Sequence, residues 1–85
     1  MKLQLRFFAS LREGLGLSEE WVNLPADVKT IAQLRHHLTQ RGGAWAEVLA
    51  SDKVIRCALN QRMVKESIAL EEGAEVAFFP PVTGG

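Results

Sequence analysis

The chain has 85 residues, of which 47% are hydrophobic and 24% are charged, a composition typical of one small folded domain and too apolar for a disordered one. Ten basic and ten acidic residues cancel, and no basic stripe is present, which disfavours nucleic-acid binding and electrostatic attachment to a membrane. No apolar run is long enough to span a bilayer. Since the single cysteine, Cys57, cannot form an internal disulfide, we expect a cytoplasmic protein.

The first part of the chain alternates between apolar and polar residues, which predicts a strand over residues 2–8. The buried face of this strand is expected to consist of Leu3, Leu5 and Phe7. A short helical turn over residues 9–13 should follow, and then a second strand over residues 20–24, which Pro25 ends.

The main helix is predicted to begin at Thr30, which forms a capping box with Gln33, because each side chain can accept the other's backbone amide. The helix carries one apolar stripe made of Ile31, Leu34 and Leu38. Gly42 and Gly43 are expected to end it, since glycine is the usual residue after a helix. A second short helix is predicted over residues 44–50.

The second half of the chain reads as further strands, over residues 54–60, 62–64 and 75–79. Asn60 and Gln61 form the predicted tight turn between the first two of these strands. Two early strands, a helix and then more strands predict an α+β fold, with a mixed sheet of about five strands and one main helix across one face. This order suits the β-grasp, or ubiquitin-like, roll, in which the first and last strands pair in parallel at the centre.

A search for catalytic chemistry finds no phosphate-binding loop, no dinucleotide fingerprint and no metal-ligand spacing. His36 and His37 are adjacent on the predicted helix and so point roughly 100° apart, which makes them poor co-ligands. Cys57 falls on the apolar face of its strand and reads as a small core residue. Three acidic residues near the last turn, Glu71, Glu72 and Glu75, read as solvated. We find no self-contained active site and expect no bound metal or permanent cofactor.

The C-terminal carboxylate is the exception. Pro80 and Pro81 stop sheet pairing and stiffen the chain, and the final two glycines carry no side chain, so they suit a narrow slot. We therefore expect a β-grasp domain over residues 1–80 and an extended, flexible tail over residues 81–85. At roughly 3.3 Å per residue, the segment from Pro80 to Gly85 can reach about 20 Å from the sheet edge. Such a terminus is suited to activation as an acyl-adenylate inside a partner enzyme.

The predicted registers also place apolar side chains on the sheet face opposite the helix. These side chains are Phe8, Met63, Ala77 and Phe79. An exposed apolar patch on a small domain is typical of a partner-binding site, and we expect one here.

The ending Glu75-Val76-Ala77-Phe78-Phe79-Pro80-Pro81-Val82-Thr83-Gly84-Gly85 resembles that of the molybdopterin synthase small-subunit family, which is a ubiquitin-like β-grasp family of sulfur carriers. Three further segments agree in the same order, namely Leu5-Arg6-Phe7-Phe8-Ala9, Leu11-Arg12-Glu13 and Leu59-Asn60-Gln61. The similarity spans essentially the whole chain, and the tail motif is its most specific part.

The resemblance implies a sulfur carrier that is one subunit of the two-subunit sulfurtransferase. An adenylyltransferase similar to ubiquitin-activating enzymes would use ATP to adenylate Gly85, and a persulfide donor would convert the adenylate to a thiocarboxylate (1-thioglycine). The thiocarboxylate would then give its sulfur to a pterin precursor in molybdenum cofactor biosynthesis. The resemblance also implies a heterotetramer with two large and two small subunits.

By the same resemblance, Gly85 is the reactive terminus, and the residues of the threaded tail are Pro81, Val82, Thr83 and Gly84. Phe8, Met63 and Phe79 would form the docking patch for the large subunit, with Arg12 as a polar contact at its rim.

Three alternatives remain open at this point. The diglycine also suits a ubiquitin-like modifier that is joined to lysine amines of other proteins. It equally suits a sulfur carrier for another pathway, such as thiamine or cysteine synthesis. A plain interaction domain with an idle tail is the third alternative, and it predicts that removal of Gly84 and Gly85 changes nothing.

Overall fold

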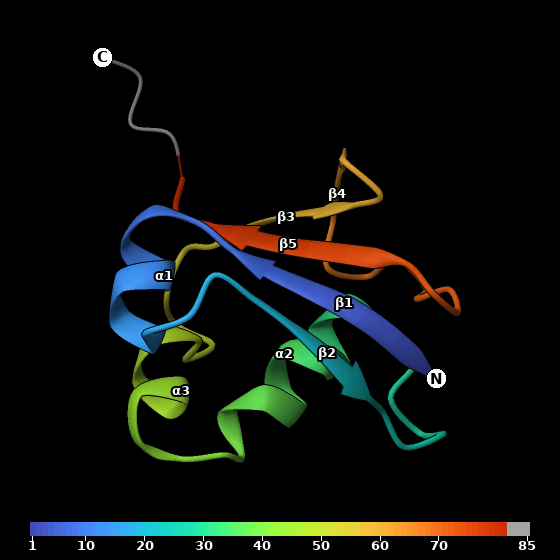
Figure 1. Ribbon diagram of the computed structural model, residues 1–85, viewed down its shortest axis with the longest axis horizontal. Helices are drawn as coiled ribbons and strands as arrows, with labels where there is room; N and C mark the ends of the chain where they lie inside the picture. Colours follow the sequence, from blue (N-terminus) through green and yellow to red (C-terminus); the bar gives the residue numbers. More distant parts are fainter. Residues whose placement is uncertain (82–85) are drawn as a thin grey trace.

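The computed structural model describes residues 1–81. In these residues five strands and three helices follow one another along the chain (Figure 1). Their bounds are β1 Lys2–Phe7, α1 Ala9–Leu15, β2 Glu19–Asn23, α2 Ile31–Thr39, α3 Gly43–Val48, β3 Arg56–Leu59, β4 Arg62–Val64 and β5 Glu75–Phe79. The predicted strands and helices are thus all present, with ends that shift by one or two residues. Within the same residues, no helix is both long and apolar enough to cross a membrane.

The strands form one mixed sheet in the order β2-β1-β5-β3-β4. β1 and β5 pair in parallel, with Leu5 opposite Val76 and Phe7 opposite Phe78, whereas the other neighbours are antiparallel. The first and last strands therefore lie at the centre of the sheet, as the β-grasp prediction required. Because β5 is a central strand, hydrogen bonds on both sides hold the point from which the chain continues into Pro80.

The three helices lie on one side of the sheet and leave the opposite side uncovered (Figure 1). The core between the two layers contains nine fully buried side chains, which are Leu3, Leu5, Phe7, Ile31, Leu34, Leu38, Leu49, Val76 and Phe78. The ring of Phe7 stacks on that of Phe78 with the centroids 5.9 Å apart, and it meets the Trp45 ring edge-on at 5.5 Å. Burial of these apolar side chains is the main stabilising contribution to the fold.

The main helix begins as predicted. The amide of Gln33 donates to Oγ1 of Thr30 at 3.1 Å, and the Thr30 amide donates to Oε1 of Gln33 at 3.2 Å. The predicted end was wrong, because α2 stops at Thr39 and Gly42 instead precedes α3. Gly42 has a φ of 77°, a conformation that glycine adopts without strain, so it lets the chain turn directly into the next helix.

The predicted hairpin between β3 and β4 is also confirmed. Asn60 and Gln61 have φ angles of 50° and 67°, and a two-residue turn of the kind that matches strand twist needs positive φ at both positions. Asn60 also accepts a hydrogen bond at Oδ1 from the Glu75 amide at 2.9 Å, which ties the turn to the start of β5.

Candidate functional site

The uncovered face of the sheet carries the apolar residues that the sequence placed there. Phe8 and Phe79 meet edge-to-face at the end of β5, with their ring centroids 6.4 Å apart. Phe8 is 38% exposed, Phe79 is half-buried, and Met63 on β4 is 63% exposed. These three residues, which we call the apolar patch, leave large hydrophobic side chains in water. Phe8 and Phe79 lie beside the origin of the tail, and Met63 lies two strands away from β5. Their role in partner binding stays a prediction.

Ala77 does not belong to this patch, contrary to the prediction. Its exposed fraction is only 6%, because it lies between Arg6 on β1 and Ala58 on β3 in the same cross-strand row. The short alanine side chain at the centre of a sheet is covered by its longer neighbours. Ala77 and Ala58, which is buried to a similar extent, therefore separate Met63 from the other apolar residues of this face.

Arg6 is a residue of this face that the sequence analysis did not single out. Its guanidinium carbon lies 5.3 Å from the centre of the Phe8 ring, a cation–π arrangement, and Nη1 lies 3.8 Å from Oε1 of Glu75. Within residues 1–81, Nε of Arg6 is buried without a hydrogen-bond partner. The sequence could have placed Arg6 on this face, because the two-residue period of β1 puts Arg6 on the same side as Phe8.

The other predicted site residues lie around the apolar patch or beyond the described residues. Arg12 is exposed on α1, one helical turn after Phe8, whose carbonyl accepts the Arg12 amide at 3.3 Å. Pro81 is half-buried, two residues after the end of β5. The four remaining tail residues, Val82, Thr83, Gly84 and Gly85, lie outside the described residues, so their predicted roles remain predictions.

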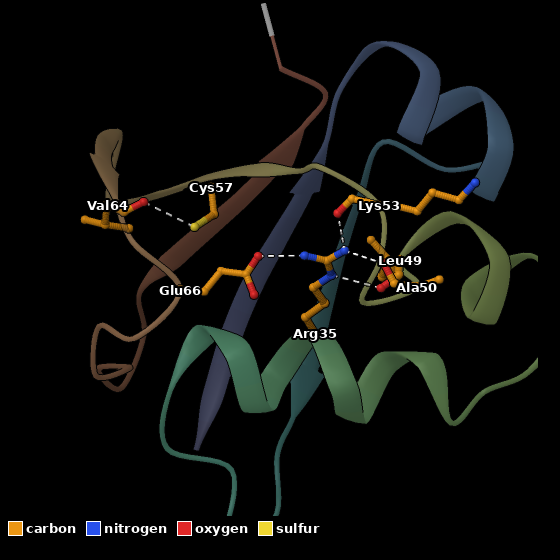
Figure 2. Close-up of polar contacts among 7 residues, drawn as sticks. All are labelled: Arg35, Leu49, Ala50, Lys53, Cys57, Val64 and Glu66. Carbon is orange, nitrogen blue, oxygen red and sulfur yellow. Dashed lines mark hydrogen bonds and ion pairs between the residues drawn. The ribbon is translucent and has the colours of Figure 1, made fainter.

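A buried arginine on the helix side was missed altogether. Arg35 points from α2 toward the segment between α3 and β3 and toward Glu66 (Figure 2). Its Nε donates to the Leu49 carbonyl at 2.9 Å, Nη1 donates to Oε2 of Glu66 at 2.7 Å, and Nη2 donates to the carbonyls of Ala50 and Lys53. Arg35 is four residues after Ile31, so it lies beside the buried stripe of α2. A charged side chain at such a position needs hydrogen-bond acceptors from other segments. This spacing is the signal by which the sequence could have identified Arg35.

The residues expected to be structural fit that reading. Cys57 is buried, and burial raises the pKa of its thiol, with Glu66 adding to the rise and Arg35 opposing it. A thiol with a raised pKa is a poor nucleophile at neutral pH. His36 is exposed, His37 is half-buried, and residues 1–81 contain no group of histidine, cysteine and acidic side chains that could hold a metal ion. Cys57, His36 and His37 thus lie where a structural role places them.

Comparison with known proteins agrees with this geometry. The model of the ThiS family matches residues 5–85. The chain is 41% identical to the molybdopterin synthase sulfur carrier subunit of Haemophilus influenzae and 40% identical to that of Escherichia coli. Each alignment has 83 residues and covers 98% of this chain and 99% of the relative.

Two solved structures are similar to the fold. Haloferax volcanii SAMP1 superposes with a TM-score of 0.75 at 24% identity and full coverage of both chains, a likeness that concerns the fold alone. The second is a chain in the complex of subunits 1 and 2 of the molybdopterin-converting factor from Helicobacter pylori. It has a TM-score of 0.67 and 26% identity, again with both chains fully covered.

The family match spans nearly the whole chain, and the curated relatives align over almost their full length. The parallel central pair, the helices on one face and the order of the strands are those of the β-grasp fold. The chain therefore belongs to the ThiS family, has the ubiquitin-like β-grasp fold, and is a relative of the molybdopterin synthase sulfur carrier subunits.

Proposed function

We propose that this chain is the sulfur carrier subunit of a molybdopterin synthase and that Gly85 carries the sulfur. The observation that supports this most directly is the identity of about 40% to two such subunits over 98% of the chain. The exposed apolar side chains of Phe8 and Met63 support it as well, because a carrier needs a docking surface for the partners that supply the catalysis.

The proposed chemistry has three steps. A carboxylate oxygen of Gly85 attacks the α-phosphorus of ATP, and pyrophosphate leaves, which converts a poor acyl donor into an acyl-adenylate. A persulfide sulfur on the donor then attacks the acyl carbon and displaces AMP, which gives an acyl disulfide. A second thiol attacks the donor's sulfur in this disulfide, forms a new disulfide with it and so releases the thiocarboxylate. Finally the thiocarboxylate sulfur bonds to the pterin precursor, and water cleaves the acyl–sulfur bond, which leaves the sulfur on the pterin and returns Gly85 to the carboxylate. ATP is thus consumed on the activating enzyme, and the chain itself keeps no cofactor.

The proposed partners follow from these steps. The adenylyltransferase and the persulfide donor load the tail, and the large synthase subunit receives it, in an assembly of two large and two small subunits. The Helicobacter pylori structure is named as a complex of subunits 1 and 2, which supports a stable contact with a second subunit. Phe8 and Phe79 of the apolar patch lie beside the origin of the tail, and Met63 extends the patch toward β4, so one partner surface can hold the domain while its active site receives residues 81–85.

The test is the intact mass of the protein purified from its native host. We expect a species in which one oxygen has been exchanged for sulfur and which mild hydrolysis returns to the plain mass. Fragmentation should place the exchange at Gly85. A plain carboxylate, found together with tail peptides joined to lysine side chains of other proteins, would instead identify a ubiquitin-like modifier and contradict the proposal.

A further inference from the structure

The charged side chains of the uncovered sheet face are distributed unevenly. Strand alternation and the observed register put five of them on this face, namely Lys2, Arg6, Glu19, Glu75 and Arg56. The two acidic residues, Glu19 on β2 and Glu75 on β5, both already contact side chains of β1. Oε1 of Glu75 lies 3.8 Å from Nη1 of Arg6, and Oε2 of Glu19 accepts a hydrogen bond from the side-chain Nε2 of Gln4 at 3.2 Å.

Arg56 is the charged residue on the other side. It is the first residue of β3, it is exposed, and it lies directly across from Phe79 in the β3–β5 ladder. The next residue of β3 on the uncovered face is Ala58. Its partner on β4 is Met63, so both neighbouring positions are apolar. Within residues 1–81, Arg56 makes no ion pair. The apolar patch therefore has an unbalanced cation at the corner nearest to the tail.

An apolar patch by itself holds a partner without fixing its orientation, because apolar burial is not directional. A charge at one corner supplies that direction, since it attracts the opposite charge during encounter and disfavours other orientations. Orientation matters here because the tail leaves the domain only two residues after Phe79. A rotated docking would direct residues 81–85 away from the partner's active site.

We propose that Arg56 pairs with a carboxylate on the large subunit and so fixes the orientation in which the apolar patch docks. This inference rests on the proposed function, because it takes the large subunit as the occupant of the face. Arg56 is a positioning residue in this account. It touches the partner and is not involved in the sulfur transfer.

Arg62 provides a matched control. It is also an exposed arginine, it begins the neighbouring strand β4, and within residues 1–81 it likewise makes no ion pair. Its cross-strand partner is Leu59, which is buried on the helix side, so Arg62 extends from the opposite face of the sheet. Arg56→Glu and Arg62→Glu change the net charge equally, on neighbouring strands, but they alter opposite faces of the sheet.

The experiment measures the affinity of full-length wild type, Arg56→Glu, Arg56→Gln and Arg62→Glu for the purified large subunit at low and high salt. We expect Arg56→Glu to weaken binding about tenfold or more at low salt, mainly through slower association, with Arg56→Gln between it and wild type. The difference should shrink at high salt, because salt screens exposed charges. Arg62→Glu should stay within about twofold of wild type. Melting temperatures of all four proteins verify that the variants fold.

The inference is overturned if Arg56→Glu and Arg62→Glu bind equally, whether both match wild type or both lose affinity by the same factor. Equal loss would show an effect of net charge and not of the place of Arg56. A wild-type chain that binds no large subunit at any salt concentration is a different result. It would refute the proposed function itself, and this inference with it.

Discussion

Arg35 and Glu66 form an ion pair that joins the main helix to the connection between β4 and β5, with Nη1 and Oε2 2.7 Å apart. The same guanidinium also binds the carbonyls of Leu49, Ala50 and Lys53, which precede β3. One side chain therefore satisfies acceptors from two segments without regular secondary structure. Because β3 begins at Arg56, this contact also supports the strand that borders the apolar patch.

We expect Arg35→Ala to lower the free energy of unfolding by about 3 kcal/mol, because it removes the partner of one buried and three partly buried acceptors at once. Glu66→Gln should cost less, about 1 kcal/mol, since Glu66 is partly exposed and an amide still accepts a hydrogen bond. Urea unfolding measures both values. Arg62→Ala is the control, with an expected change within about 0.5 kcal/mol. An Arg35→Ala variant as stable as this control would show that the network contributes nothing.

Two neighbouring phenylalanines should separate binding from stability. Phe79 is half-buried on the uncovered face, so Phe79→Ala should weaken binding of the large subunit at a small cost in stability. Phe78 is fully buried in the core, so Phe78→Ala should cost about 3–5 kcal/mol of unfolding free energy. Thermal melts and binding of the large subunit test the pair. A large fall in melting temperature for Phe79→Ala would mean that Phe79 serves the core.

Gly84→Ala is expected to leave the melting temperature unchanged and to block thiocarboxylate formation. The reason is steric, because alanine adds a Cβ where the activating enzyme is expected to admit only a glycine. Thr83→Ala is the matched control, since it removes side-chain atoms and should still be loaded. Mass spectrometry after incubation with the activating enzyme, ATP and the sulfur donor gives the result. Normal loading of Gly84→Ala would refute the steric argument.

Acid should weaken one particular contact of the fold. Arg41 holds Glu20 through two hydrogen bonds of 2.9 and 2.6 Å, and these hydrogen bonds lower the pKa of the Glu20 carboxyl although burial opposes the shift. A carboxyl whose pKa is lowered by folding stabilises the protein above its unfolded pKa. That contribution is lost as the pH falls through the folded pKa.

The comparison is therefore wild type against Glu20→Gln. Their unfolding free energies should differ by about 0.5–1 kcal/mol near neutral pH, because the pair is only partly buried. The difference should shrink as the pH falls below the ordinary glutamate pKa and through the lowered pKa of Glu20, because the wild-type carboxyl then takes up its proton. Chemical unfolding at several pH values measures it. A difference that stays constant down to the lowest pH would show that the charge of Glu20 is not what stabilises the contact.

The sequence was sufficient for most features that depend on neighbours along the chain, although it misplaced the end of α2. Alternation placed Leu3, Leu5 and Phe7 in the core, and the spacing of Thr30 and Gln33 predicted the capping box, because these signals lie within a few residues of one another. The same short-range reasoning put Phe8, Met63 and Phe79 on the uncovered face. The parallel pairing of β1 with β5 was not visible in the pattern and came from analogy with the fold.

Other features depended on contacts between distant segments, and only the tertiary structure revealed them. The burial of Ala77 results from its neighbours on β1 and β3, and the charge imbalance at Arg56 appears only once β3 lies beside Phe79. The acceptors of Arg35 come from 14 to 31 residues further along the chain. Strand alternation determines the face of the sheet on which a side chain lies. How deeply that side chain is buried, and which groups it contacts, depend on the strands and loops that pack beside it.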